Sequence, residues 1–182
     1  MFAHWAKINH RESCGLFASN GIFFNRESPS RGEEFVTRKI TKGIKEIQRG
    51  QWEFLELGSL DAKRDWGYAK DYVKAMWMVL QHNEPDDFVI AMGESRSVRE
   101  FVELAFSCVG IKIEWSGQRE HEEGRDAKNG RILVRVNPKY YRPSEVDALI
   151  GDTSKAERLL GWKKETSFHD LVKIMVDAEL RS

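Results

Sequence analysis

Arginine and lysine side chains gather in three loops of this sequence, and each loop follows an apolar, strand-like segment. The polar residues of the three loops are, in chain order, Asn25, Arg26 and Arg31, then Lys63 and Arg64, then Arg142 and Glu145. Guanidinium groups bind phosphate oxygens through paired hydrogen bonds, and lysine adds a point charge. A carboxylate can accept hydrogen bonds from ribose hydroxyls. Together the loops favour a nucleotide-type ligand with a diphosphate, whereas each one alone is equally consistent with a solvated turn.

The first of these loops lies between a predicted strand and a predicted helix. Ile22, Phe23 and Phe24 predict a buried strand, Pro29 and Gly32 predict a turn, and an amphipathic helix follows. In open α/β folds, ligands bind beyond the carboxyl ends of strands and against helix N-termini. Two arginines and an amide at such a position suit a phosphate-bearing ligand. The alternative is a turn whose arginines only face water.

Several catalytic and metal-binding patterns are absent from the sequence. It contains no G-x-G-x-x-G dinucleotide fingerprint, no G-x-S-x-G nucleophile elbow, and no tyrosine followed four residues later by lysine. The five histidines are scattered without the spacing of metal ligands. We therefore expect no metal site, and nothing supports serine or cysteine catalysis.

The composition is that of a globular protein. The chain has 182 residues, 41% of them hydrophobic, with 29 basic and 29 acidic residues and a pI near 7.0. This charge balance argues against a dedicated nucleic-acid binder, which would be strongly basic. The two cysteines form no disulfide framework, which suits a reducing cytosol, so we expect a cytoplasmic location. We expect no signal peptide and no membrane span, because no apolar run approaches about 20 residues.

Apolar periodicity predicts alternating helices and strands. Helices are expected over residues 1–13, 35–50, 69–80, 97–110 and 168–180, with a short helix opened by Asp152 or Thr153. Strands are expected over residues 15–24, 54–57, 87–91, 111–115 and 132–136. This alternation predicts an α/β fold, mostly parallel in its first half, with a more irregular and smaller lobe in its second half.

Three local expectations can be tested directly. In the helix over 69–80, an apolar face is formed by Val73, Met76, Trp77 and Leu80. In the strand over 15–24, Asn20-Gly21 predicts a bulge or a hairpin turn. Segments 58–67 and 116–130 are rich in charge or glycine and are expected to be loops.

Four stretches of the sequence resemble the C-terminal half of the GDP-mannose 4,6-dehydratase family, which belongs to the extended short-chain dehydrogenases/reductases. They are FNRESPSRGEEFVTRKI, LGSLDAKRDWGYAKDYVKAMW, DDFVIAMGESRSVREFVE and KYYRPSEVDALIGDTSKAERLLGW. The resemblance runs almost from end to end of residues 1–182. It implies the C-terminal part of a Rossmann-like parallel sheet together with a smaller α/β substrate-binding lobe. It also implies a homo-oligomer in the intact enzyme.

The family resemblance implies an NADP-dependent lyase reaction. GDP-D-mannose is oxidised at C4, water is eliminated across C5–C6, and the hydride returns to C6. The product, GDP-4-dehydro-6-deoxy-D-mannose, is a precursor of GDP-fucose. In the family, a Thr or Ser, a Glu, and a Tyr-x-x-x-Lys dyad perform this chemistry.

The resemblance also assigns roles to individual residues. Asn25, Arg64 and Arg142 match residues at the substrate diphosphate, Val36 and Lys39 match residues at the guanine, and Glu145 matches a carboxylate near the GDP ribose. Arg31 matches an arginine near NADP. Arg26 stands at the position of a family histidine near the nicotinamide, where its longer side chain could reach a cofactor phosphate.

The family's catalytic residues match no position in this chain. The dyad lysine directly precedes the segment that matches Met1, so we expect the catalytic residues to lie upstream of it. The helical spacing of Phe2, Trp5 and Ile8 without a preceding cap fits a helix entered part-way. The alternative is a non-catalytic nucleotide-sugar-binding module or an inactive relic of the same fold. An epimerase or reductase is disfavoured by the LDAKRDWG stretch.

Overall fold

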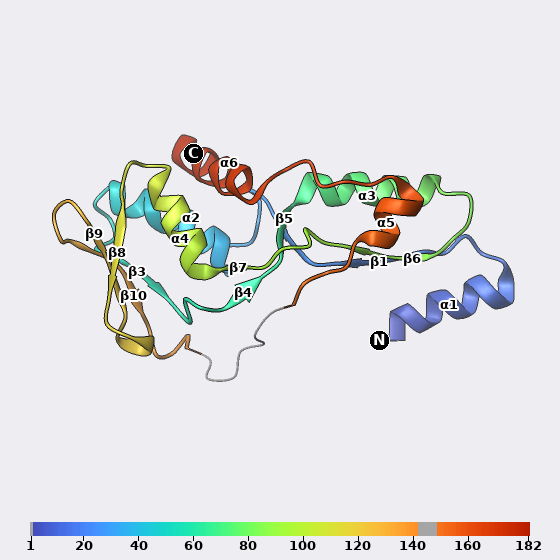
Figure 1. Ribbon diagram of the computed structural model, residues 1–182, viewed down its shortest axis with the longest axis horizontal. Helices are drawn as coiled ribbons and strands as arrows, with labels where there is room; N and C mark the ends of the chain where they lie inside the picture. The colour runs from blue at the N-terminus through green and yellow to red at the C-terminus, as the bar shows by residue number, and fades with distance from the viewer. Residues whose placement is uncertain (1, 142–148) are drawn as a thin grey trace. The chain divides into compact units, whose positions relative to one another are not determined.

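The computed structural model describes residues 2–141 and 149–182 and has two compact units (Figure 1). The first unit collects Met1–Arg26, Asp65–Glu94 and Ile150–Ser167. The second collects Glu27–Arg64, Ser95–Leu149 and Phe168–Ser182. The α/β class predicted from the sequence is confirmed. The predicted division between a first and a second half is wrong, because each unit is assembled from three separate segments of the chain.

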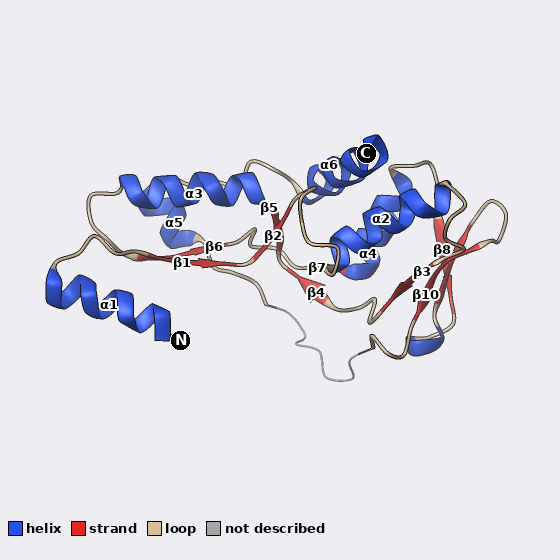
Figure 2. Ribbon diagram, turned by 180° about the vertical axis from the view of Figure 1, so that it is seen from behind, coloured by secondary structure: helices blue, strands red, loops and turns tan. Residues whose placement is uncertain are grey.

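The first unit is a two-stranded parallel sheet with helices on both faces. Its elements are α1 (Phe2–Cys14), β1 (Asn20–Phe23), β5 (Trp66–Tyr68), α3 (Ala69–Gln81), β6 (Asp87–Ile90) and α5 (Ser154–Leu160). β1 pairs with β6 in parallel, with a register that runs from Asn20 opposite Asp87 to Phe23 opposite Ile90. The short strand β2 (Asn25–Glu27) pairs with β5. In Figures 1 and 2, α3 and α5 lie on one side of the β1–β6 sheet and α1 lies on the other.

The core of the first unit lies between the sheet and the helices α3 and α5. It is formed by Tyr72, Ala75, Val79, Phe88, Ile90, Met92, Ala156 and Trp162. Trp162 is almost fully buried, and its indole N–H donates to the backbone oxygen of Asp71 at 3.0 Å. Burial of a tryptophan is favourable when its one donor is satisfied in this way. The carboxylate of Asp71 accepts hydrogen bonds from the backbone N–H groups of Glu165 and Thr166 at 3.2 and 3.0 Å, which fixes the chain beyond α5.

The apolar face expected on α3 does not face the core. Val73, Trp77 and Leu80 are 61%, 63% and 65% exposed, and Met76 is 38% exposed. The helix instead buries Tyr72, Ala75 and Val79. Both faces of α3 carry apolar residues at helical spacing, so periodicity alone could not show which of them contacts the sheet.

The first strand is shorter than the sequence predicted. Residues 15–19 are not part of a strand, and β1 begins at Asn20. Asn20 and Gly21 are paired residues of the strand, so the expected bulge or hairpin turn is wrong. Asn20 is buried, and its amide donates to Asp87 Oδ1 at 3.0 Å. This tertiary hydrogen bond offsets the preference of an Asn-Gly pair for a turn.

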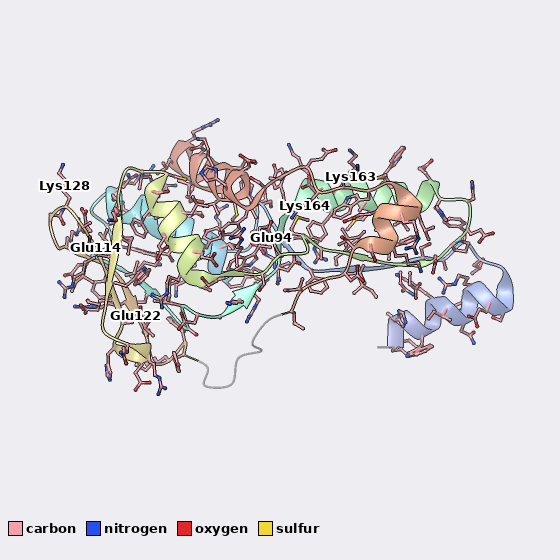
Figure 3. The ribbon with its side chains drawn as sticks, in the orientation of Figure 1. Glu94, Glu114, Glu122, Lys128, Lys163 and Lys164 are labelled. Atoms are coloured by element: carbon pink, nitrogen blue, oxygen red, sulfur yellow. The ribbon has the colours of Figure 1, made fainter. Side chains whose placement is uncertain are left out.

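Asp65 is the buried polar centre of the first unit. Its carboxylate accepts hydrogen bonds from the backbone N–H groups of Met92, Gly93 and Gly151 at 2.7, 3.0 and 3.4 Å. Burial raises the pKa of Asp65, and these hydrogen bonds act in the opposite direction. Lys164 donates to the backbone oxygen of Met92 at 2.8 Å and pairs with Glu94 at 3.1 Å (Figure 3). Asp65 therefore fixes two chain segments that are far apart in the sequence.

The second unit combines a mixed four-stranded sheet with three helices. Its elements are α2 (Val36–Gln48), β3 (Leu55–Leu57), β4 (Lys63–Arg64), β7 (Arg96–Ser97), α4 (Val98–Ser107), β8 (Ile113–Ser116), η1 (Arg119–His121), β9 (Glu123–Asp126), β10 (Ile132–Val136) and α6 (Phe168–Arg181). The sheet order is β3-β10-β9-β8, with β3 and β10 parallel and the other pairs antiparallel. β4 and β7 form a separate antiparallel pair.

The three helices of the second unit pack on one another through apolar residues and one buried charge cluster. Ile40, Ile44, Phe101 and Phe106 are fully buried, and Phe101 packs edge-on against Phe168. Glu179 of α6 is buried and lies 3.0 Å from the Arg38 guanidinium and 3.7 Å from the Lys45 amine. Removing one partner of such a cluster would leave an uncompensated charge. The capping box predicted at Ser97 and Glu100 is confirmed at the start of α4.

Both segments predicted as loops contain strands. Segment 58–67 carries β4 and part of β5, and segment 116–130 carries η1 and β9. The sequence of β9, Glu-Gly-Arg-Asp, is polar. In the folded chain its Glu123 forms ion pairs with Arg125 and Arg135 at 2.7 and 2.9 Å. Its Gly124 instead lies against Trp115, where a side chain would not fit. A strand of this kind is stabilised by its two neighbours, and its own sequence shows no apolar alternation.

We expect Asp65→Ala to destabilise the first unit by about 3 kcal/mol, because three backbone N–H donors would lose their acceptor and the two buried ones, those of Met92 and Gly151, are each worth about 1–3 kcal/mol. The measurement is the urea unfolding midpoint. Asp61→Ala is the matched control, because Asp61 is exposed and its bond to Arg99 is a surface ion pair worth about 0–1 kcal/mol. An equal drop in the urea unfolding midpoint for the two variants would contradict the stabilising role given to Asp65.

We expect Arg11→Ala to loosen α1, because the Arg11 guanidinium donates to Asp87 Oδ1 at 2.9 Å. Burial alone would raise the pKa of Asp87, but the hydrogen bonds from Arg11 and Asn20 outweigh it and lower this pKa. A carboxylate with a lowered pKa stabilises the fold above its unfolded pKa of about 3.9, and this contribution is lost as the pH falls through the lowered value. The difference in melting temperature between wild type and Arg11→Ala should therefore be constant from pH 7 to pH 5 and shrink below about pH 4.

Lys7→Ala, an exposed change on the same helix, serves as the control for that comparison. If the difference in melting temperature between wild type and Arg11→Ala already changes between pH 7 and pH 5, a titrating group other than Asp87 is responsible for the pH dependence.

Candidate functional site

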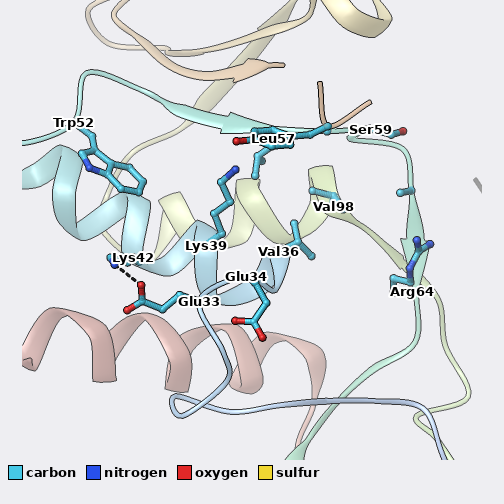
Figure 4. Close-up of a pocket in the computed structure, with 13 residues that line it drawn as sticks. Glu33, Glu34, Val36, Lys39, Lys42, Trp52, Leu57, Ser59, Arg64 and Val98 are labelled. Atoms are coloured by element: carbon cyan, nitrogen blue, oxygen red, sulfur yellow. Dashed lines mark hydrogen bonds and ion pairs between the residues drawn. The ribbon is translucent and has the colours of Figure 1, made fainter. Parts of the chain in front are cut away.

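A cavity of about 550 Å³ lies within the second unit (Figure 4). Residues from α2 and from the loop before it line one side. Leu57, Gly58 and Ser59 at the end of β3 line another. Arg64 of β4 and Tyr140 complete the charged and aromatic parts of the lining. The cavity thus contains cationic, anionic and aromatic groups in one unit of the fold.

The cavity lies at the carboxyl ends of two parallel strands. β3 and β10 end side by side, with Leu57 opposite Val136, and the N–H of Asn137 donates to the backbone oxygen of Leu57 at 2.8 Å. Gly58 then follows β3, and Tyr140 follows β10. A Cβ atom on Gly58 would lie 2.3 Å from the backbone oxygen of Tyr140, so only glycine permits this approach. Ends of parallel strands are a common place for ligands in α/β folds.

The N-terminus of α2 adds partial positive charge to the cavity. Val36, its first residue, is part of the lining, and the N-cap residue Phe35 offers no side-chain hydrogen bond. The first N–H groups of a helix have no partner within the helix, and the helix dipole favours an anion there. An anionic ligand in the cavity would therefore be stabilised by α2 as well as by side chains.

Lys39 is the cation closest to an aromatic ring of the cavity. Its amine lies 4.1 Å from the centroid of the Tyr140 ring, which is the geometry of a cation–π contact. Burial lowers the pKa of Lys39, and the nearby carboxylate of Glu56 acts in the opposite direction. A partly desolvated lysine gains more from an anionic partner than one in bulk water.

Other charged groups at the cavity have partners on the chain itself. Lys42 donates to Glu33 at 2.5 Å (Figure 4), and this hydrogen bond raises the pKa of Lys42 and lowers that of Glu33. Arg64 Nη1 donates to the backbone oxygen of Lys63 at 2.7 Å, which holds its guanidinium at the cavity. The Lys42–Glu33 pair is neutral as a whole, so the remaining charged groups of the lining are the cations Lys39 and Arg64 and the carboxylate of Glu34.

The structure brings together three of the residues expected to bind the ligand. Val36, Lys39 and Arg64 all line the cavity although they come from α2 and β4. Sequence reasoning missed Lys42, Trp52 and Tyr140, which also line it. The position of Lys42 one helical turn after Lys39 was a usable signal. No local pattern points to Trp52, since it reaches the cavity only through the packing of the second unit.

The remaining expected residues do not line the cavity as described. Asn25 and Arg26 belong to the first unit, where the Asn25 amide donates to the backbone oxygen of Asp65 at 3.0 Å and the Arg26 guanidinium lies 5.8 Å from the Phe23 ring centroid. Arg31 lies in the second unit but outside the cavity lining, with its guanidinium 3.5 Å from the Phe35 ring centroid. Its Nε lies 3.5 Å from Glu27.

The third loop is not covered by the structure. Arg142 and Glu145 lie outside the described residues, so their roles stay predictions. Among the residues that are described, no group of three His, Cys, Asp or Glu side chains could hold a metal ion. In the same part of the chain, no helix is long and apolar enough to cross a membrane.

The fold resembles that of solved nucleotide-sugar enzymes. It matches RMD from Pseudomonas aeruginosa, solved with NADPH, with a TM-score of 0.81 at 18% identity, over 98% of this chain and 54% of that one. It also matches dTDP-glucose 4,6-dehydratase from Bacillus anthracis, solved with NAD, with a TM-score of 0.74 at 14% identity, over 97% of this chain and 49% of that one. The chain thus has the fold of extended short-chain dehydrogenases/reductases over about half of their length.

The sequence comparisons are more specific. Residues 1–175 match the family model described as GDP-mannose 4,6 dehydratase. The chain is 56% identical over 180 residues to GDP-mannose 4,6 dehydratase of Cricetulus griseus and 54% identical over 180 residues to that of Homo sapiens. These alignments cover 99% of this chain and 48% of each relative, so the chain spans about half the length of the curated relatives it matches. The chain belongs to the GDP-mannose 4,6-dehydratase family.

We expect Gly58→Ala to destabilise the second unit by about 1–3 kcal/mol, the usual cost of forcing an extra atom into a packed site. The added Cβ would meet the backbone oxygen of Tyr140 and push the ends of β3 and β10 apart. Gly32→Ala is the control, because its Cβ would meet only the flexible carboxylate end of Glu34. The melting temperature of each variant is the measurement. If Gly58→Ala and Gly32→Ala have equal melting temperatures, the close approach of Gly58 to the Tyr140 backbone is contradicted.

Proposed function

We propose that this chain is the GDP-sugar-binding half of a GDP-mannose 4,6-dehydratase, and that the cavity of the second unit holds the GDP group. The observation that carries the proposal is the meeting of Lys39 and Arg64, from separate elements, in one cavity of a chain that belongs to this family. The enzyme would convert GDP-D-mannose to GDP-4-dehydro-6-deoxy-D-mannose and water. The chain's part in this reaction is to bind and orient the nucleotide.

The diphosphate would interact with the guanidinium of Arg64 and with the N-terminus of α2. A guanidinium can hold two phosphate oxygens at once, and the unpaired N–H groups of a helix start add a favourable field. We propose that Arg142 completes the diphosphate site and that Glu145 accepts hydrogen bonds from the ribose, as in the family. A diphosphate needs about two or three such partners.

The base would lie toward Lys39 and the aromatic lining. Lys39 is already held over the Tyr140 ring, so its amine loses little freedom when a ligand oxygen replaces water. Val36 contributes an apolar contact at the start of α2. Guanine presents a carbonyl oxygen that can accept a hydrogen bond from the Lys39 ammonium. These features support a purine nucleotide with an exocyclic oxygen.

NADP is the cofactor implied by the family, and the residues present on this chain do not form a complete site for it. Arg31 stacks on Phe35 and faces Glu27, and Arg26 lies in the other unit beside Phe23. The sequence carries no glycine-rich dinucleotide loop. We propose that Arg31 and Arg26 contribute at most peripheral contacts to NADP.

The alternative from a different class is a non-catalytic nucleotide-sugar-binding module or an inactive relic. One observation favours it for the chain by itself. The groups that line the cavity suit binding and orientation, and no Tyr-x-x-x-Lys pair occurs in the sequence. The two hypotheses differ in one respect: in the dehydratase, this chain acts together with a catalytic portion of the fold, and in the binding module it does not.

Calorimetric titration of the chain with GDP and GDP-mannose tests the proposed function. We expect both ligands to bind and Lys39→Ala and Arg64→Ala each to weaken binding about 10- to 100-fold, which corresponds to losing one hydrogen bond to a charged group. Lys63→Ala is the control, since Lys63 is the exposed neighbour of Arg64 and does not line the cavity. The chain alone, supplied with GDP-mannose and NADP, should form no product.

Two results would overturn this proposal. One is GDP affinity that is unchanged in both cavity variants, which would place the nucleotide elsewhere. The other is product formation by the chain alone, because a complete catalytic site would then be present on it.

A further inference from the structure

Trp52 belongs to the segment that connects α2 to β3, and backbone hydrogen bonds fix its position at the cavity. Gly50 follows the helix with a φ of 72°, which turns the chain back over the last turn of α2. The N–H groups of Gln51 and Trp52 then donate to the backbone oxygen of Glu46 at 2.9 and 3.2 Å. This turn places the half-buried side chain of Trp52 in the lining of the cavity.

The indole of Trp52 packs against α2 at a position where the helix has no side chain. A Cβ atom on Gly43 would lie 3.5 Å from Cζ3 of Trp52. Gly43 comes four residues after Lys39, so the two positions lie on the same face of the helix. In Figure 4 the Trp52 ring and the Lys39 side chain lie on the same side of α2. The cavity therefore has an indole ring and an amine on one helix face.

The Trp52 ring has no polar or aromatic partner within the part of the chain that the structure describes. No cation and no second ring contacts it there, and its indole N–H donates no hydrogen bond to these residues. Trp115 and Trp162, by contrast, each donate a hydrogen bond at 2.7 and 3.0 Å. The other aromatic ring of the cavity, that of Tyr140, already has the Lys39 amine 4.1 Å from its centroid. Trp52 is thus the ring of the cavity that can accept a flat ligand.

A nucleotide base fits an indole ring and an amine placed in this way. Every base has a π face, and stacking on an aromatic side chain contributes strongly to its binding. The edge of guanine carries a carbonyl oxygen that can accept a hydrogen bond from an ammonium group. Stacking uses the face of the base and the hydrogen bond uses its edge, so one base can make both contacts at once.

We propose that Trp52 is the residue on which the base of the bound nucleotide stacks, while Lys39 binds the edge of the same base. This inference rests on the proposed function, because it assigns one more contact within the same cavity. The backbone hydrogen bonds to Glu46 and the packing on Gly43 hold the ring in place before binding. Ordering this side chain therefore costs little when the ligand binds.

Calorimetric titration with GDP and with inorganic pyrophosphate, which has no base, tests the stacking contact. Trp52→Ala should weaken GDP binding about 5- to 150-fold, the usual effect of losing one base–aromatic stack. It should leave pyrophosphate affinity within about twofold, because the phosphate contacts are independent of the ring. Trp52→Phe keeps an aromatic ring and should recover most of the lost GDP affinity.

Tryptophan fluorescence gives a second readout that does not require Trp52→Ala to fold. A base stacked on an indole quenches the indole emission, so GDP should quench the wild type and leave the emission of Trp52→Phe almost unchanged. Trp77→Phe is the matched control, because Trp77 is an exposed tryptophan of the other unit. It should keep both the quenching and the GDP affinity of the wild type.

Three results would contradict the stacking contact while the proposed function stands. They are a GDP affinity that Trp52→Ala leaves unchanged, equal weakening of GDP and pyrophosphate binding, and full quenching by GDP in Trp52→Phe. Equal weakening would show that the indole only maintains the shape of the cavity. If the wild-type chain binds no GDP at all, the stacking contact and the proposed function are both wrong.

Discussion

The parallel pairing of β3 with β10 is the constraint on which the candidate site depends. It brings two strand ends together, and the chain that follows each strand then contributes to one cavity. The contact is close enough that Gly58 has no room for a side chain against the Tyr140 backbone. The ring of Tyr140 in turn lies against the amine of Lys39, so the position of this cation at the cavity depends on the backbone approach between Gly58 and Tyr140. Loss of that approach would change the shape of the cavity without touching a charged residue.

The first unit has a different organising centre. The buried carboxylate of Asp65 connects residues that follow β6 with the segment at Gly151, so a single side chain fixes the packing of α5 and the end of the sheet. Around this ordered centre, the outer face of α3, the edge of β1 and α1 stay exposed. The cavity proposed to hold the nucleotide, by contrast, lies wholly among residues of the second unit.

Elements with strong local signals were predicted well. α2, α4 and α6 follow their apolar periodicity, and the capping box of Ser97 and Glu100 starts α4 where expected. β9 was missed because its stability comes from pairing with β8 and β10 and from the ion pairs of Glu123. The core-facing side of α3 was missed because both of its sides are apolar. Lys39 and Arg64 were each expected to contact the substrate and both line one cavity, whereas their contact with a ligand, like the roles of Arg142 and Glu145, stays a prediction.

The sequence by itself determined the family and the α/β class, because local spacing and residue chemistry carry that information. Only the tertiary structure decided which of the cationic residues share a cavity, since Lys39 and Arg64 are separated by a strand and a loop and meet through the packing of β3, β4 and α2. It also decided that Asn25 donates to the Asp65 backbone and that the stripe on α3 faces outward. Hydrogen-bond partners and buried faces depend on which neighbours are present, and a linear pattern does not encode those neighbours.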